Sequence, residues 1–172
     1  MADLEKVDIV GTPALDGTYV AEMDMWPFEA QEFNRIYPFY ENLRAGKFTT
    51  TKCKKCGYVT YPPHVICPEC YSDELEYIDL PQKGKVIVFS EQLRGVPLGF
   101  EPAPLIHAWI DLGETSPLKR LLSRIINCPS GTLKEGDEVQ FVVFDVPAHP
   151  IEIKKETIVA ERVFFAFEPV NK

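Results

Sequence analysis

The sequence predicts a mostly β protein in which a short helical segment, a four-cysteine metal ribbon and a small closed β-barrel follow one another. Three observations lead to this prediction. Two Cys-x-x-Cys pairs lie close together, at residues 53–56 and 67–70. Fifteen prolines in 172 residues disfavour long helices. Beyond Pro81, segments rich in β-branched residues alternate with turn-forming residues, as expected of short strands.

Residues 1–47 are expected to form an N-terminal arm with short helices. Residues 1–27 show little periodicity and predict an extended segment with one strand around residues 19–23. A proline removes a hydrogen bond inside a helix, so two short helices are predicted. One covers 29–36, and the other begins at Pro38 and ends with Gly46 as its C′ residue. Phe39 would lie on the buried face of this second helix.

Residues 48–80 are predicted to form a rubredoxin-like zinc ribbon. Each Cys-x-x-Cys turn directs two thiolates to one point, so two turns supply four ligands: Cys53, Cys56, Cys67 and Cys70. Four thiolates favour Zn²⁺ and leave no position open for substrate, which indicates a structural metal. Iron in the same site and two disulfides are the alternatives. His64 lies between the pairs and is expected to be a surface residue.

The ribbon is expected to have strands over 48–52 and 75–78, which flank the two cysteine turns. So small a module cannot bury a core of its own. We therefore expect its folding to depend on the metal.

Residues 81–172 are predicted to form a five-stranded barrel of the OB type with a C-terminal extension. Short strands with long, variable connections favour this closed barrel over a β-sandwich. Residues 147–158 are expected to be a connection, with a solvated charge run at 153–156. The strands are predicted over 85–93, 105–112, 118–126, 138–146 and 162–168.

Charge and hydropathy restrict the partners. The formal net charge is −8, so the average field repels nucleic-acid backbones and anionic membranes. No segment approaches the ~20 apolar residues needed to span a bilayer. The N-terminal residues are acidic where a signal peptide would be basic. A cytoplasmic location is expected, where cysteines stay reduced for metal binding.

Two groups of residues outside the ribbon are candidate sites. Cys128 could act as a nucleophile with His107 or His149 as base, but unpaired cysteines are more often buried structural residues. Lys119, Arg120 and Arg124 could hold the phosphates of a nucleotide-like ligand, with a solvated strand face as the alternative. Neither group forms a recognisable catalytic motif.

The order of helix, Cys₄ ribbon and OB-type barrel resembles the acyl-CoA-associated zinc-ribbon/OB-fold family, long catalogued as a domain of unknown function. The resemblance covers about residues 33–146. The sequences that carry it are FYENLRAGKF at 39–48, CKKCG at 53–57, YPP at 61–63, CPEC at 67–70, GKV at 84–86 and the Gly-Asp-Glu-Val turn within 133–139.

The resemblance implies a non-catalytic subunit of a thiolase or thiolase-like aldolase. Such a subunit would form a hetero-oligomer with the catalytic chain and help shape its CoA-thioester site, with acyl-CoA at the interface. No catalytic residue and no independent enzyme activity are then expected here. The residues considered as partner contacts are Trp26, Phe28, Phe39 and Tyr40, and those considered as CoA-phosphate contacts are Arg94, Lys119, Arg120 and Arg124.

A single-stranded nucleic-acid-binding module is the alternative from another class. Zinc ribbons and OB barrels both commonly bind single strands, through aromatic side chains beside a basic groove. The aromatic residues are present, but the acidic balance of the chain opposes this function.

Overall fold

The computed structural model of the chain describes residues 35–96, 103–146, 150–153, 156–159 and 162–170. Most of the first predicted helix, the strand predicted at 19–23, and Trp26, Phe28 and His149 lie outside the described residues. The described elements are α1 (Tyr37–Arg44), β1 (Thr49–Cys53), β2 (Val59–Thr60), β3 (Leu75–Asp79), β4 (Lys83–Gln92), β5 (Leu105–Asp111), β6 (Arg120–Ile125), β7 (Glu138–Val146), β8 (Pro150–Ile153), β9 (Glu156–Val159) and β10 (Arg162–Pro169).

Helix α1 ends as the sequence predicts. Gly46 adopts a φ of +71°, which an L side chain would disfavour. Its backbone N–H donates to the carbonyl of Leu43, and that of Lys47 donates to the carbonyl of Asn42, both at 2.8 Å. These two bonds form a Schellman motif, which satisfies the last carbonyls of the helix and turns the chain into β1.

The apolar face of α1 packs on the barrel. Phe39 and Leu43 are buried and form a cluster with Val163 of β10, with Tyr40 and Tyr77 at its edge. The Phe39 ring therefore contributes to the core and is not free to contact a partner. Tyr40 is half-buried, so its role as a partner contact stays a prediction.

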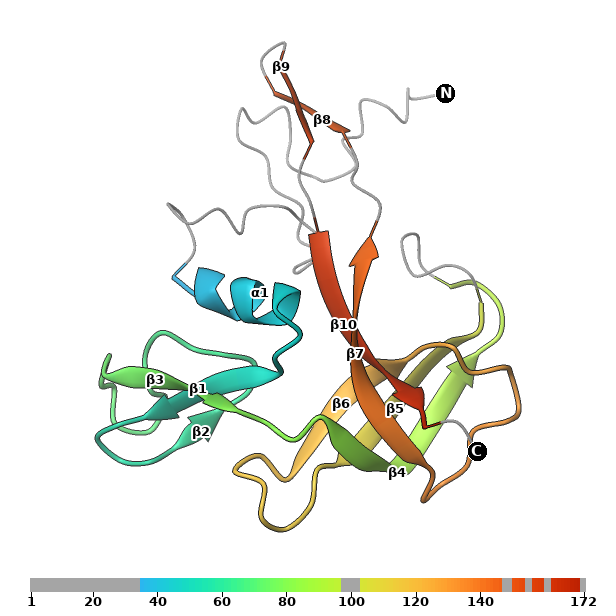
Figure 1. Ribbon diagram of the computed structural model, residues 1–172, viewed down its shortest axis with the longest axis horizontal. Helices are drawn as coiled ribbons and strands as arrows, with labels where there is room; N and C mark the ends of the chain where they lie inside the picture. Colours follow the sequence, from blue (N-terminus) through green and yellow to red (C-terminus); the bar gives the residue numbers. More distant parts are fainter. Residues whose placement is uncertain (1–34, 97–102, 147–149, 154–155, 160–161, 171–172) are drawn as a thin grey trace.

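The ribbon is a three-stranded antiparallel sheet in the order β2-β1-β3. Thr51 pairs with Thr60 of β2 and with Tyr77 of β3, so β1 lies at the centre. The predicted strands at 48–52 and 75–78 are confirmed to within a residue, and β2 was not predicted. The ribbon lies beside α1 at the left of Figure 1.

The barrel is closed, in the order β10-β6-β5-β4-β7. Strands β4, β5 and β6 form an antiparallel meander, β7 returns beside β4, and β10 closes the barrel between β7 and β6 (Figure 1). The five predicted strands are therefore confirmed, and the alternative β-sandwich is wrong. Gly84 is required where β4 passes β5, because a Cβ atom there would collide with the Ile110 side chain and with the Asp111 carbonyl.

The connection predicted at 147–158 is wrong in one respect. It contains a two-stranded antiparallel sheet formed by β8 and β9, which projects beyond the barrel in Figure 1. A stretch of four residues such as Pro150–Ile153 gives too short an alternating pattern to distinguish a strand from a loop.

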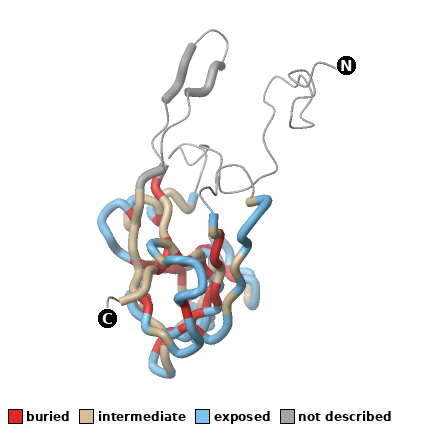
Figure 2. The backbone as a smooth tube through the Cα atoms, turned by 90° about the vertical axis from the view of Figure 1, so that its right-hand side faces the viewer, coloured by how far each residue is buried: buried red, intermediate tan, exposed pale blue. Residues whose placement is uncertain are grey.

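The barrel interior is apolar and continuous. Buried stretches gather inside the lower body of the molecule in Figure 2. The buried cluster comprises Phe48, Leu80, Val86, Ile106, Ala108, Ile110, Leu112, Leu121, Ile125, Leu133, Val139 and Phe167.

Phe48, which precedes the ribbon strand β1, joins the ribbon to the barrel. Its ring stacks on Phe141 with centroids 4.8 Å apart, and also contacts Phe165 and the ribbon residue Tyr61. The backbone carbonyl of Phe48 accepts a hydrogen bond from the N–H of Leu80 at 2.8 Å. The two modules therefore share one aromatic cluster.

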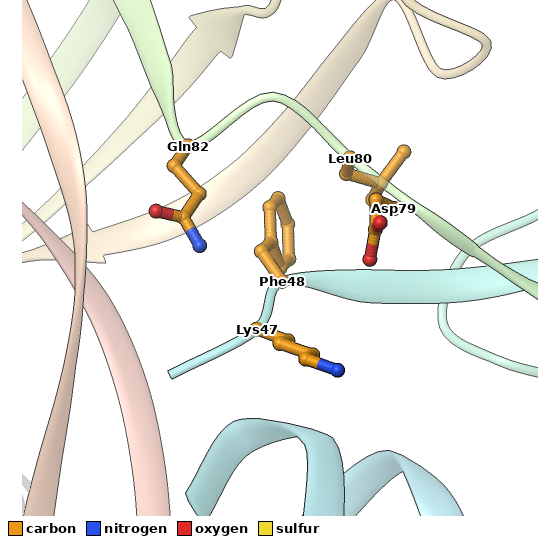
Figure 3. Close-up of a pocket in the computed structure, with 5 residues that line it drawn as sticks. All are labelled: Lys47, Phe48, Asp79, Leu80 and Gln82. Carbon is orange, nitrogen blue, oxygen red and sulfur yellow. The ribbon is translucent and has the colours of Figure 1, made fainter. Parts of the chain in front are cut away.

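A pocket of about 290 Å³ lies at this joint (Figure 3). Its lining residues are Lys47, Phe48, Asp79, Leu80 and Gln82, and Figure 3 shows the Phe48 ring between Gln82 and Leu80. The volume is at the lower limit for ligand pockets, about 300 Å³. We regard it as a feature of the joint.

Within the described part of the chain, no helix is long and apolar enough to cross a membrane.

Candidate metal centre and surface cations

The two cysteine turns are built on the same backbone pattern. In the first, the N–H of Gly57 donates to the carbonyl of Cys53 at 2.9 Å, and in the second the N–H of Tyr71 donates to the carbonyl of Cys67 at the same distance. Both fifth residues have positive φ, 78° for Gly57 and 57° for Tyr71. Each turn thus closes on a left-handed residue and directs its two thiols to one side.

The four predicted ligands come together. The Sγ atoms of Cys53, Cys56, Cys67 and Cys70 all lie within 4.8 Å of one another. Those of Cys53 and Cys70 are 3.6 Å apart, and those of Cys56 and Cys67 are 3.5 Å apart. A tetrahedral site with Zn–S bonds of about 2.3 Å requires neighbouring sulfurs about 3.8 Å apart. The thiols are therefore arranged to chelate one tetrahedral metal ion.

Electrostatics inside the cluster also favour a cation. The backbone N–H of Cys56 lowers the pKa of the Cys53 thiol to about 7. The N–H of Tyr58 acts in the same direction on Cys56, but burial and the neighbouring thiols outweigh it and raise the pKa of Cys56 to about 12. Four thiolates so close together repel one another, so complete deprotonation requires a bound metal ion.

The positions of the sulfur atoms and of His64 decide two questions that the sequence leaves open. All the cysteines are free, and sulfurs 3.5 Å apart are far beyond the disulfide length of about 2.05 Å, so the disulfide alternative is wrong. His64 is exposed and is not part of the thiol cluster, as predicted. The arrangement suits Zn²⁺, and a tetrahedral thiolate site can also accept iron.

Buried threonines hold the loop between the two turns against β1. The hydroxyls of Thr51 and Thr60 lie 2.8 Å apart, and the backbone N–H of His64 donates to the Thr51 hydroxyl at 3.0 Å. The Thr50 hydroxyl donates to the carbonyl of Thr60. Hydrogen bonds between buried polar groups therefore contribute to holding this loop in place.

Cys128 makes no hydrogen bond to a histidine in the described part of the chain. Its thiol lies 3.4 Å from the Thr132 hydroxyl and 3.8 Å from the Pro129 carbonyl. His107 lies on β5, paired in register with Ser90 and Arg124. These contacts suit a structural cysteine, and no described general base activates it.

The four cations considered as CoA contacts lie on the barrel but do not surround one pocket. Arg120 and Arg124 lie on the same face of β6. Four residues of strand separate them by about 13 Å. Lys119 directly precedes Arg120. Arg94 follows the C-terminal end of β4, whereas Arg120 lies level with Lys85 near the start of that strand. Their role as phosphate contacts stays a prediction.

Sequence reasoning missed Tyr71 and Trp109. Tyr71 is 82% exposed in the left-handed conformation that glycine occupies in the first turn. Its position directly after the second cysteine of the pair, which glycine occupies in the first turn, could have indicated this conformation. Trp109 is 46% exposed between the buried residues Ala108 and Ile110, although its strand is apolar. The alternation of His107, Trp109 and Asp111 along β5 could have identified it as outward-facing.

Comparisons with known proteins agree with this arrangement. The family model described as "ChsH2, rubredoxin-like zinc ribbon domain" matches residues 41–76. A DUF35 domain-containing scaffold protein of Methanothermobacter thermautotrophicus is 33% identical over 95 residues, 55% of this chain and 69% of that protein. The benzoylsuccinyl-CoA thiolase subunit BbsA of Thauera aromatica is 33% identical over 100 residues, 58% of this chain and 65% of that subunit. The chain thus spans about two thirds of the length of these relatives.

A solved structure titled "Ltp2-ChsH2(DUF35) aldolase" shares the fold. The similarity has a TM-score of 0.55 and covers 81% of this chain and 98% of that chain, at 18% sequence identity. At this level of identity the likeness extends to the fold alone. It supports the combination of a ribbon and a closed barrel described above.

Proposed function

The chain belongs to the DUF35 family, and from this premise we propose that it is a non-catalytic accessory subunit of a thiolase-like, acyl-CoA-processing complex. The observation that carries the proposal is the 33% identity to a benzoylsuccinyl-CoA thiolase subunit, and the match of residues 41–76 to the ChsH2 zinc-ribbon family model supports it. The chain would dock on the catalytic subunit and help shape its CoA-thioester site.

The chemistry of the site supports an accessory role. Four thiolates complete a tetrahedral shell, so a metal ion held by them has no open position for substrate. Within the described residues, Cys128 contacts Thr132 and Pro129, and neither can serve as a general base. The nucleophile and bases of the reaction would then belong to the partner.

We assign Zn²⁺ to the four cysteines as a structural metal. When bound, it would supply no chemistry beyond fixing the two turns. The Phe48 ring, directly before β1, contacts Phe141 and Phe165 of the barrel. A ribbon fixed by the metal would therefore also be fixed relative to the barrel. The ribbon thereby fixes α1 and the barrel in one relative orientation, as a docking subunit requires.

Acyl-CoA is proposed to lie at the interface, in a cytoplasmic hetero-oligomer. Arg94, Lys119, Arg120 and Arg124 are the candidate contacts for its phosphates, since guanidinium groups bind phosphate as a fork and lysine as a point charge. Their alanine variants should raise the KM for CoA in the assembled complex if this assignment is correct.

The test begins with purification of the tagged chain from the cells that encode it, at physiological ionic strength. Mass spectrometry then identifies any co-eluting catalytic subunit, and the two chains are expressed separately and together. Thiolysis of a β-ketoacyl-CoA is followed as loss of the free CoA thiol. We expect no turnover by this chain alone, and more turnover by the complex than by the partner alone.

Cys128→Ser provides the control, and it should leave the activity of the complex unchanged. Turnover by the isolated chain, or purification without any thiolase-like subunit, would contradict the proposed function.

A further inference from the structure

Three outward-facing apolar side chains lie side by side on the barrel. Val88 of β4 pairs in register with Trp109 of β5, which pairs with Leu122 of β6. They are 46%, 46% and 52% exposed, respectively. Directly opposed residues of antiparallel strands have Cβ atoms about 4.5–5.5 Å apart, so the three side chains form a continuous patch. We call these three residues the apolar row.

The apolar row is separate from the barrel core. On β5 and β6, the residues that alternate with Trp109 and Leu122 are the buried ones, Ile110 and Leu121 among them. Helix α1 packs on β10 and β1 instead (Figure 1). Within the described chain, no helix or strand therefore covers these three side chains. Adjacent exposed apolar residues of this kind mark interaction sites more often than scattered single ones do.

Charged and polar residues border the row on both sides. Lys85, Asp111 and Arg120 are paired across the three strands on one side of the apolar row. Asp111 also accepts a hydrogen bond from the N–H of Gly113 at 2.9 Å, so its carboxylate caps its own turn.

On the other side, Ser90, His107 and Arg124 are paired in the same way. Burial and the neighbouring Arg124 lower the pKa of His107, which keeps its ring neutral at pH 7. The two borders together hold three cations and one carboxylate, in a chain whose net charge is −8.

This arrangement matches the anatomy of a protein interface. Such interfaces have an apolar centre and a polar rim, and the few residues that dominate their binding energy are enriched in tryptophan, tyrosine and arginine. The face also comprises the second and third strands of the barrel, the surface on which OB folds commonly bind oligonucleotides and oligosaccharides, so a nucleic acid is the main competing occupant.

The composition of the face selects among possible occupants. Bases of a nucleic acid stack on aromatic rings, and two of the three residues of the apolar row are aliphatic. A second copy docking by the same face would bring two faces together that each carry Lys85, Arg120 and Arg124 against the single carboxylate of Asp111, and repulsion between like charges opposes this. An apolar surface rimmed by carboxylates on a different protein fits both features.

We propose that the outer face of β4, β5 and β6, centred on Val88, Trp109 and Leu122, is the surface that docks on the catalytic subunit, through an apolar patch rimmed by carboxylates on that subunit. This inference rests on the proposed function, because it assumes that such a subunit exists. It assigns the cations at the rim to protein carboxylates, in addition to any contact with CoA.

The test uses the full chain and the separately purified catalytic subunit identified by co-purification. Trp109→Ala and Leu122→Ser each alter an exposed side chain, so the fold should be retained, and metal content and thermal unfolding check this. We expect the Kd for the subunit to rise about 30-fold or more for Trp109→Ala, as for a hot-spot residue. Ile66→Ser, an equally exposed aliphatic position on the ribbon, is the matched control and should bind like wild type.

Charge reversal at the rim provides an independent test. Lys85→Glu with Arg120→Glu should weaken binding and reduce its salt dependence, whereas Lys54→Glu with Lys55→Glu, exposed on the ribbon, should change neither. A contact with CoA can be distinguished from a contact with the subunit. A variant that loses only a CoA contact has a higher KM for CoA at saturating subunit and an unchanged Kd between the two chains.

Unchanged binding by folded Trp109→Ala and Leu122→Ser variants would overturn this inference and leave the proposed function intact. Wild-type binding to a single-stranded oligonucleotide that these variants lose would overturn it in favour of nucleic acid. Self-association that these variants abolish would favour a second copy instead. Absence of any thiolase-like partner for the wild type would contradict the inference and the proposed function together.

Discussion

Different interactions stabilise the interior of the ribbon and the interior of the barrel. The buried residues of the ribbon are mainly threonines and cysteines, joined by hydrogen bonds and by the convergent thiols. The barrel buries a continuous apolar cluster, in which Ile110, Val139 and Phe167 have no exposed surface. We therefore expect the ribbon to depend on a bound metal ion for folding, whereas the barrel buries a sufficient apolar core of its own.

The largest effect should come from removing a metal ligand. Cys67→Ser leaves three thiolates, and structural Zn²⁺ contributes on the order of 10 kcal/mol to the folding of such a ribbon. We expect metal content to fall below one ion per chain and the ribbon to unfold while the barrel persists. Metal analysis and the NMR amide spectrum measure this.

Cys128→Ser is the matched control for this variant, since Cys128 lies outside the thiol cluster. Retention of one metal ion and of a folded ribbon in Cys67→Ser would contradict the account.

A substitution in the barrel core should destabilise the barrel and leave the ribbon folded. Ile110→Ala should lower the free energy of unfolding of the barrel by about 2–5 kcal/mol, because the side chain is fully buried and leaves a cavity. Metal binding by the ribbon should remain. Denaturant unfolding compares this variant with Ile87→Ala, which removes the same atoms from a side chain 38% exposed and should cost much less. Equal losses for both variants would show that β4 and β5 do not pack as described.

The ribbon and the barrel could be predicted because their signals are local. Two Cys-x-x-Cys pairs specify a chelating turn within four residues each, and the alternation over 138–146 specifies a half-buried strand. The end of α1 at Gly46 was likewise predicted from one residue whose conformation suits glycine.

What was missed depends on longer-range or weaker signals. The β8–β9 hairpin consists of strands too short to show a period. The alternation along β5 could have identified Trp109 as outward-facing, but its place between Val88 and Leu122 follows from the pairing of the strands, which one strand's sequence does not define. Phe39 was predicted to lie on the buried face of its helix and was also considered as a partner contact, and its cluster with Leu43 and Val163 of β10 confirms the burial.

A smaller effect should distinguish the two cysteine turns. Tyr71 holds a left-handed φ of 57°, which costs a residue with a Cβ about 1 kcal/mol relative to glycine. Tyr71→Gly should therefore stabilise the metal-bound ribbon by up to about 1 kcal/mol, measured as a rise in its thermal unfolding temperature. Gly57→Ala, at the equivalent position of the first turn, should destabilise it by a similar amount. A destabilised Tyr71→Gly variant would indicate that the ring makes a stabilising contact.

The smallest effect concerns pH and the barrel. The folded pKa of His107 lies below its ordinary value of 6.5, so the unfolded chain binds the proton more readily. The stability that the neutral ring supports is complete above pH 6.5 and is lost as the pH falls toward the folded pKa. His107→Gln should flatten the decline of unfolding free energy between about pH 7 and 5. An unchanged decline in the variant would assign it to other groups.

The most direct test of the contrast between the two modules is hydrogen exchange of the full chain before and after metal chelation, read peptide by peptide. We predict that the amides of β1, β2 and β3 lose their protection when the metal is removed, while those of β5, β6 and β10 keep theirs. Loss of protection throughout the barrel, or retained protection in the ribbon, would contradict it.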